Sequence, residues 1–365
     1  PDADIRPRLT YGRPDWFEFH ATEHRAVREA VGLFDMSAMS KFLVQGPDAE
    51  AVLNRLSGND VAVAVGRCVY TQWMNERGGV EADVTITRLA DERFQLVAAE
   101  GFHRRVEAML RRGTPSGARM YVTDVTSGLA LLSVQGPRSR ELLDELTTAD
   151  LGNEAFPYLT AQEIDLHHAR ALAVRMSFVG ELGWELFVPT EFALGVYDAL
   201  VEAGGAVGLA HAGMATLEST RTEAGRLDYG LDMENSDSPL EAGLKFAVDL
   251  DKPGGFVGRD ALLAQYEQRP YRSRLVQFLL EDPEPLLHGE EPILLDGAPV
   301  GYIRSGAYGH TLGGAMGFGY VEHPDGVSAD LVRNGRFEIR VAGASVPAAA
   351  SLRSMYDPDN QRVRM

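Results

Sequence analysis

The sequence predicts an α+β protein in two parts. Residues 1–270 form an α+β region with antiparallel sheets, and residues 271–365 form a separate small β-barrel or sandwich. Three observations support this: a strictly alternating strand after Gly78-Gly79, a strand–helix unit that occurs twice, and a change to short strands with turn signals near residue 270. A chain of 365 residues is long enough for two or three domains.

Composition excludes several classes of function. The net charge is -18, which argues against nucleic acid as a partner, because phosphates require clustered Lys and Arg. The single cysteine, Cys68, excludes an internal disulfide framework and a multi-cysteine metal site. No apolar run approaches the roughly 20 residues of a membrane span, and the first residues resemble no signal peptide. We therefore expect a cytoplasmic protein that does not enter a membrane.

Helical periodicity predicts the helices. Phe17, Ala21, His24 and Val27 recur at helical spacing. The predicted helices cover residues 16–32, 102–112, 191–204 and 212–226.

The repeated unit is a strand, a Gly-Pro turn and a Leu-rich helix. The motif Val-Gln-Gly-Pro occurs at residues 44–47 and again at residues 134–137. Pro near the first turn of each following helix fits this interpretation. Two copies suggest an internal duplication in a pseudo-symmetric α+β region.

Two carboxylates lie in predicted strands. After Gly78-Gly79, the apolar residues Val80, Ala82, Val84 and Ile86 alternate with polar ones, and Asp83 falls in the middle. Glu185 lies between Trp184 and Leu186 in a second strand region, residues 171–189. Asp is disfavoured in strands, so Asp83 is either solvated on an open sheet face or directed into a cleft.

Other motifs are weak or absent. His20, Glu23 and His24 match the H-x-x-E-H pattern of inverted zinc peptidases, but no further ligand is evident, so we interpret them as packing or surface residues and expect no metal site. No G-x-G-x-x-G follows a strand, and neither a phosphate-binding loop nor a G-x-S-x-G elbow is present.

Taken in order, several short motifs resemble the aminomethyltransferase family, which includes the glycine cleavage T-protein. The resemblance is stronger to the folate-binding C-terminal half of dimethylglycine and sarcosine dehydrogenases. The motifs are Tyr11–Phe17, Gly32–Ser37, Gly78–Asp83, Gly180–Glu185, Arg221–Glu223, Pro239–Leu244, Phe256–Arg259 and Ser305–His310. The resemblance implies a three-lobed cloverleaf fold, with two α+β lobes and a C-terminal β-barrel lobe, around a central tetrahydrofolate channel.

The resemblance also assigns roles to single residues. Asp83 matches the catalytic aspartate, and Glu185 matches the carboxylate that accepts the paired N–H groups of the pterin. The remaining candidates are Tyr70, Phe178 and Arg221 at the cofactor, and His288 and Tyr308 at the substrate. Tyr70 is alternatively a half-buried strand residue, and the role of Arg221 is either structural or anion-facing.

The sequence departs from the family at three positions. Phe178 stands where relatives often have Tyr. Leu217 and His288 stand where T-proteins carry arginines. These departures favour the dehydrogenase-associated branch over T-protein itself.

We therefore expect a tetrahydrofolate-dependent one-carbon transferase acting on a small N-methylated amino acid, such as dimethylglycine or sarcosine. Because residues 1–365 include no FAD domain, the chain is a fragment, works with a separate flavin oxidase, or demethylates directly. The alternatives are a demethylase of another onium, S-methyl or O-methyl donor, a subunit that only docks to an oxidase, and a non-catalytic folate-binding protein like certain iron–sulfur assembly factors.

Overall fold

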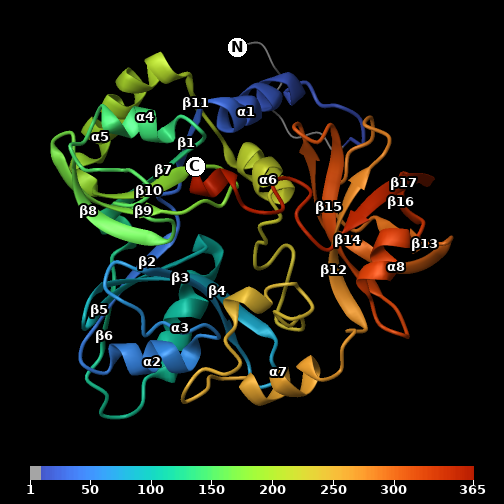
Figure 1. Cartoon of the computed structure of the whole chain (residues 1–365), viewed down its shortest axis with the longest axis horizontal. Helices are drawn as coiled ribbons and strands as arrows, with labels where there is room; N and C mark the ends of the chain where they lie inside the picture. The colour runs from blue at the N-terminus through green and yellow to red at the C-terminus, as the bar shows by residue number, and fades with distance from the viewer. Residues whose placement is uncertain (1–9) are drawn as a thin grey trace.

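The computed structural model describes residues 10–365, which form three lobes around the segment that follows helix α6 (Figure 1). Two lobes combine an antiparallel or mixed sheet with helices, and the third is a closed six-stranded barrel. The predicted α+β fold class with a C-terminal barrel is confirmed. No helix of residues 10–365 combines the length and apolar character needed to cross a bilayer.

The first lobe is built on a five-stranded sheet of order β3-β4-β5-β2-β6. Its elements are β2 (Ser40–Gln45), α2 (Ala49–Leu56), β3 (Cys68–Met74), β4 (Val80–Ala90), β5 (Arg93–Ala98), α3 (His103–Gly113) and β6 (Tyr121–Asp124). The apolar face of β4 packs with α2 and α3 in the core of this lobe. The opposite face of β4 carries Glu81, Asp83 and Thr85, so the predicted alternation places Asp83 outside the core.

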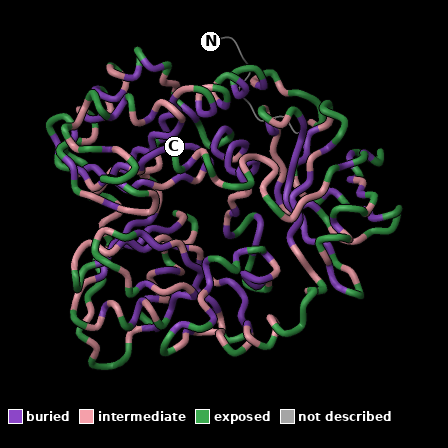
Figure 2. The backbone as a smooth tube through the Cα atoms, viewed as in Figure 1, coloured by how far each residue is buried: buried purple, intermediate pink, exposed green. Residues whose placement is uncertain are grey.

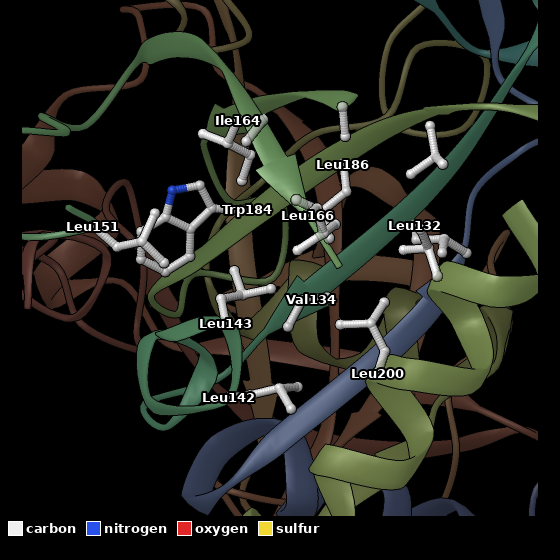
Figure 3. Close-up of a cluster of buried hydrophobic side chains, with 14 of the residues drawn as sticks. Leu132, Val134, Leu142, Leu143, Leu151, Ile164, Leu166, Trp184, Leu186 and Leu200 are labelled. Atoms are coloured by element: carbon white, nitrogen blue, oxygen red, sulfur yellow. The ribbon is translucent and has the colours of Figure 1, made fainter. Parts of the chain in front are cut away.

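The second lobe is built on a six-stranded sheet of order β11-β1-β7-β10-β9-β8. Its elements are α1 (Phe17–Glu29), β1 (Val31–Asp35), β7 (Leu129–Gln135), α4 (Ser139–Asp144), β8 (Thr160–Leu166), β9 (Ala169–Arg175), β10 (Gly183–Pro189), α5 (Thr190–Gly204) and β11 (Leu209–His211). Trp184 and Leu186 of β10 point into the core beneath α4 and α5 (Figure 3). Glu185 between them therefore points away from that core, because strand side chains alternate.

The barrel follows a connecting region. Helices α6 (Met214–Glu223) and α7 (Arg259–Tyr266) flank an irregular segment, and the barrel has the strand order β12-β15-β14-β13-β16-β17. Its elements are β12 (Ser273–Leu280), β13 (Pro292–Leu295), β14 (Ala298–Gly309), β15 (Gly314–Glu322), α8 (Ala329–Asn334), β16 (Phe337–Val341) and β17 (Ala344–Ser351). Asp296 (φ 49°) and Gly297 (φ 82°) form the predicted hairpin turn.

The two copies of the Gly-Pro unit have the same local structure. Strand β2 runs into Gly46 (φ 127°) before α2, and β7 runs into Gly136 (φ 138°) before α4. A Cβ on Gly46 would lie 2.1 Å from the carbonyl oxygen of Arg119, and one on Gly136 would lie 2.3 Å from that of Ala30. Both positions therefore require glycine, for its conformation and for the close approach of another backbone.

Two predicted helices are shorter than expected. Helix α1 ends at Glu29 rather than residue 32, because Val31 begins β1, which pairs with β7 and β11. Helix α6 ends at Glu223 rather than residue 226, and Gly225 beyond it adopts a φ of 68°. In both cases tertiary pairing or a turn replaces the last helical turn.

The lobes contact one another through apolar side chains. Cys68 and Val97 of the first lobe pack against Leu131, Val174 and Phe187 of the second. Buried residues follow the central strands of all three lobes, whereas most exposed residues lie in loops at the periphery (Figure 2). Beside this contact lie the sheet faces that carry Asp83 in the first lobe and Glu185 in the second. Both residues line a cavity, which is described next.

Candidate active site

A cavity of about 730 Å³ opens where the three lobes meet. Its wall is formed by β4, by β10, by the irregular segment after α6, by β12 of the barrel, and by residues 351–364 of the chain's last segment. A volume of this size is typical of a small-molecule site. The polar groups that face it are described below.

Asp83 faces the cavity from the middle of β4. The β3–β4 hairpin sets Gln72 directly opposite Asp83. The Gln72 Nε2 donates to Asp83 Oδ1 at 2.9 Å, and the Tyr70 hydroxyl donates to Oδ2 at 3.0 Å. The hairpin register thus holds the carboxylate in one orientation with two neutral donors.

Burial changes the acidity of Asp83. It raises the pKa of this carboxyl from 3.8 to about 7, against the hydrogen bonds from Gln72 and Tyr70 and with a further contribution from the negative charge of Asp228. A carboxyl that titrates near neutral pH can exist as a base or as an acid under physiological conditions.

Glu185 faces the cavity from the second lobe. Burial raises the pKa of its carboxyl to about 7. Within residues 10–365 its carboxylate accepts no hydrogen bond from the protein. A half-buried carboxylate without a protein partner is costly, and a ligand with N–H donors would satisfy it.

Asp228 is a third cavity carboxylate that we did not predict. It lies in the irregular segment after α6, and burial raises its pKa to about 6. Its side chain also has no hydrogen-bond partner in the described part of the chain, although its backbone N–H donates to Asp232. No periodicity marks this segment, so sequence patterning offered no signal for Asp228.

Two of the predicted aromatic residues also line the cavity. Tyr70 stacks on Phe246 with ring centroids 6.2 Å apart, and Phe178 is part of the cavity lining. The structure therefore brings Asp83, Tyr70, Phe178 and Glu185 to one cavity from two lobes.

Arg221 does not reach the cavity. Its side chain is fully buried and forms ion pairs with Glu218 and Asp232. It also donates to the carbonyl oxygen of Arg226 at 3.1 Å, while the Arg226 N–H donates to the carbonyl of Arg221 at 2.9 Å. Its contacts are therefore those of a residue that shapes the turn after α6, which agrees with the structural one of the two roles considered for it.

His288 and Tyr308 do not line the cavity either. The His288 Nε2 lies 2.7 Å from the Thr10 carbonyl oxygen, and the Tyr308 ring packs edge-on against Phe17 at 4.8 Å. These contacts join the barrel to the start of the chain. The structure therefore gives both residues a packing environment, and their predicted contact with the substrate stays a prediction.

The histidines of the H-x-x-E-H pattern are packing residues, as interpreted from the sequence. His24 is 1% exposed, with Nδ1 2.8 Å from Ser219 Oγ and Nε2 2.9 Å from Thr311 Oγ1. Glu23 accepts hydrogen bonds from the Gly213 N–H and the Thr216 hydroxyl. Within residues 10–365 no group of three or more His, Cys, Asp or Glu side chains is arranged to hold an ion.

Comparison with known proteins identifies the family. Residues 2–252 match the family described as GCVT N-terminal domain, and residues 273–357 match the glycine cleavage T-protein C-terminal barrel domain. The solved glycine cleavage system aminomethyltransferase T from Bartonella henselae is 26% identical, with a TM-score of 0.79 over 91% of this chain and 88% of its own.

Two curated relatives extend well beyond the chain. The 4-methylaminobutanoate oxidase (formaldehyde-forming) of Paenarthrobacter nicotinovorans is 43% identical over 97% of this chain and 42% of its own length. The mitochondrial sarcosine dehydrogenase of Homo sapiens is 36% identical over 99% of this chain and 41% of its own. The chain thus spans about two fifths of these relatives. With both domains matched and the three-lobed fold in place, the chain belongs to the glycine cleavage T-protein family of tetrahydrofolate-dependent aminomethyltransferases.

Proposed function

We propose that the chain transfers a one-carbon unit from a small N-methylated amino acid, or from the imine derived from it, to tetrahydrofolate. The observation that carries this proposal is the placement of Asp83 and Glu185, from two different lobes, on one cavity of about 730 Å³. The two curated relatives are named for N-methylated amino acids, which supports this class of donor.

Glu185 is proposed to hold the pterin end of the cofactor. The amino group and adjacent ring N–H of a reduced pterin form a parallel donor pair, which an ionised carboxylate accepts side by side. The Glu185 carboxylate has no protein donor of its own in the described residues, so binding the pterin would satisfy a group that is otherwise desolvated without compensation. The residues present therefore fit the cofactor.

Asp83 is proposed as the catalytic residue. Tetrahydrofolate, when bound, supplies the nitrogen nucleophiles that accept the one-carbon unit. The ionised Asp83 would stabilise positive charge on the donor and accept a proton at Oδ1 or Oδ2. Tyr70 and Gln72 fix its orientation, and burial keeps its pKa near 7 so that both protonation states are accessible.

Oxidation of the donor is proposed to take place outside residues 1–365, on a flavin-containing domain or a separate flavin subunit. The support is the length of the curated relatives, which are named as an oxidase and a dehydrogenase and of which this chain spans about two fifths.

The test is an assay with thiol-protected tetrahydrofolate and a panel of N-methylated amino acids, each with and without an amine-oxidising flavoprotein that uses dissolved oxygen as its electron acceptor, followed by analysis of one-carbon folates. We expect folate products with the wild type and at least a hundredfold lower turnover with Asp83→Asn, which should still bind folate. Asp91→Asn, an exposed residue of the turn after β4, is the matched control. Unchanged turnover in Asp83→Asn, or no product with any donor, would refute the proposal.

A further inference from the structure

Arg226 is an unpaired cation in the wall of the cavity. Its guanidinium makes one side-chain hydrogen bond, from Nη2 to Asn360 Oδ1 at 2.7 Å, and its buried Nε has no partner. Arg221, five residues earlier, forms ion pairs with two carboxylates, whereas Arg226 forms none with any of the described residues.

Other polar groups gather beside it. We call this group the arginine cluster, and it consists of Arg226, Arg364, Tyr158 and Asn360, all of which line the cavity. Arg364 is exposed and has no ion pair with residues 10–365. Burial raises the pKa of the Tyr158 hydroxyl, the positive charges of Arg226 and Arg364 oppose that rise, and the negative charges of Cys68 and Glu185 add to it. A neutral Tyr158 hydroxyl remains available as a donor.

The cluster is held in place by contacts outside the cavity. The segment that carries Asn360 and Arg364 is fixed by Arg362, which donates to Glu181 at 2.7 Å and to the Arg28 carbonyl oxygen at 2.7 Å. The turn that carries Arg226 is fixed by its two backbone contacts with Arg221. Segments far apart in the sequence therefore present donors to one place. Because these segments are already fixed, a ligand would pay little entropy to order them on binding.

The cluster shares the cavity with the proposed catalytic carboxylate. Arg226, Asp83 and Tyr70, whose hydroxyl donates to Asp83, all line it. Burial and Asp83 raise the pKa of Tyr70, and the charge of Arg226 opposes this rise. A cation and an anion on neighbouring parts of one wall match a ligand that carries both charges. A half-buried guanidinium whose Nε is buried without a partner is best satisfied by a carboxylate, which accepts two N–H groups at once.

We propose that the arginine cluster is a subsite for a carboxylate group of the bound ligand. Two ligands of the proposed function carry this group: the amino-acid donor and the glutamate end of tetrahydrofolate. The inference rests on the proposed function for the identity of these ligands, and the experiment below separates the two sources and separates the subsite from folate binding itself.

The experiment measures binding of two matched ligand pairs to the full chain by calorimetry under anaerobic conditions. The first pair is tetrahydrofolate and tetrahydropteroate, which lacks the glutamate. The second is N,N-dimethylglycine and its amide, each added with saturating tetrahydropteroate. The variants are Arg226→Met and Asn360→Asp, and the control is Arg336→Gln, an exposed barrel residue whose loss changes the net charge equally.

Asn360→Asp is the sharpest variant. Its new carboxylate would stand at the position of an oxygen that already lies 2.7 Å from Arg226, so it would pair with the guanidinium and compete with the ligand. A purely structural role predicts that this substitution is harmless, because the side chain keeps its shape and its contact. Thermal unfolding of each variant without ligand checks that the fold is intact.

We expect the carboxylate-bearing member of at least one pair to bind roughly ten- to hundredfold more tightly than its analogue in the wild type and in Arg336→Gln. The pair that shows the preference identifies the source of the carboxylate. Both Arg226→Met and Asn360→Asp should abolish it. Equal binding within both pairs, or a preference that survives Arg226→Met, would overturn the subsite. Failure of tetrahydropteroate to bind at all would refute the proposed function instead.

Discussion

Replacing Asp83 with asparagine should make the ligand-free protein more stable at pH 8 while it inactivates the site. Burial raises the pKa of the folded carboxyl from 3.8 to about 7. Between these two pH values the unfolded chain is ionised at this position while the folded protein keeps its proton. The wild type therefore loses stability as the pH rises from about 4 to about 7, and the loss then levels off.

The size of the effect follows from the pKa difference and from the two hydrogen bonds. The interval between 3.8 and about 7 corresponds to at most about 4 kcal/mol in the free energy of unfolding, which water in the cavity reduces. Asparagine has one acceptor oxygen, so either Tyr70 or Gln72 loses its partner, at a cost of about 1 kcal/mol. The net gain is about 1–3 kcal/mol at pH 8 and near zero at pH 5, where the folded Asp83 is already protonated.

The assay is urea unfolding of wild type and Asp83→Asn at pH 5 and pH 8 without ligand, followed by tryptophan fluorescence. Asp91→Asn, in the exposed turn after β4, controls for the loss of a charge and should show no pH-dependent gain. An equal change in the free energy of unfolding at the two pH values would refute the reasoning, because it would mean that Asp83 is not desolvated in the folded protein.

Three further predictions concern other parts of the molecule. Glu185→Gln should weaken tetrahydrofolate binding roughly ten- to hundredfold, and wild-type binding should tighten as the pH rises through about 7, where Glu185 ionises. Calorimetry across pH 6–8 checks both expectations. A variant whose affinity changes with pH in the same way as that of the wild type would contradict them. Gly46→Ala should lower the free energy of unfolding by about 2 kcal/mol or more, because of the φ of 127° and the backbone contact at 2.1 Å, whereas Gly101→Ala, with no atom within 4 Å of its Cβ, should be near neutral in the same unfolding assay. Burial alone would raise the pKa of Glu223, but contacts with His24 and Arg28 hold this pKa at about 2. Glu223→Gln should therefore lower the free energy of unfolding by about 3–5 kcal/mol at pH 7, and this deficit should shrink as the pH falls from 4.5 toward 2. A deficit of the same size at pH 7 and pH 3 would count against the pairing.

Much of the site was predictable because strands have a period of two. Alternation in β4 separates Val80, Ala82 and Val84 from Asp83, and the burial pattern of the strand follows this alternation. The same rule separates Glu185 from Trp184. Each prediction needs only local backbone geometry, which nearby residues determine.

Other parts of the site lie in segments without periodicity. Asp228, Arg226 and Asn360 occur in turns, where polar residues are common and no repeat shows which side chains face inward. For Arg221, the position in an ordered motif left a structural and an anion-facing role open, and the contacts with Glu218 and Asp232 show a buried ion-paired residue.

The amino-acid sequence by itself determined the elements, the duplicated Gly-Pro unit, the fold class and the two strand carboxylates, since all of these depend on residues close together along the chain. Only the tertiary structure decided that Asp83 and Glu185 share a cavity, that Arg226 and Arg364 reach it without carboxylate partners in residues 10–365, and that His288 and Tyr308 do not line it. The physical reason is that charge, desolvation and hydrogen-bond satisfaction depend on neighbours from distant segments, and the packing of the three lobes alone sets those neighbours.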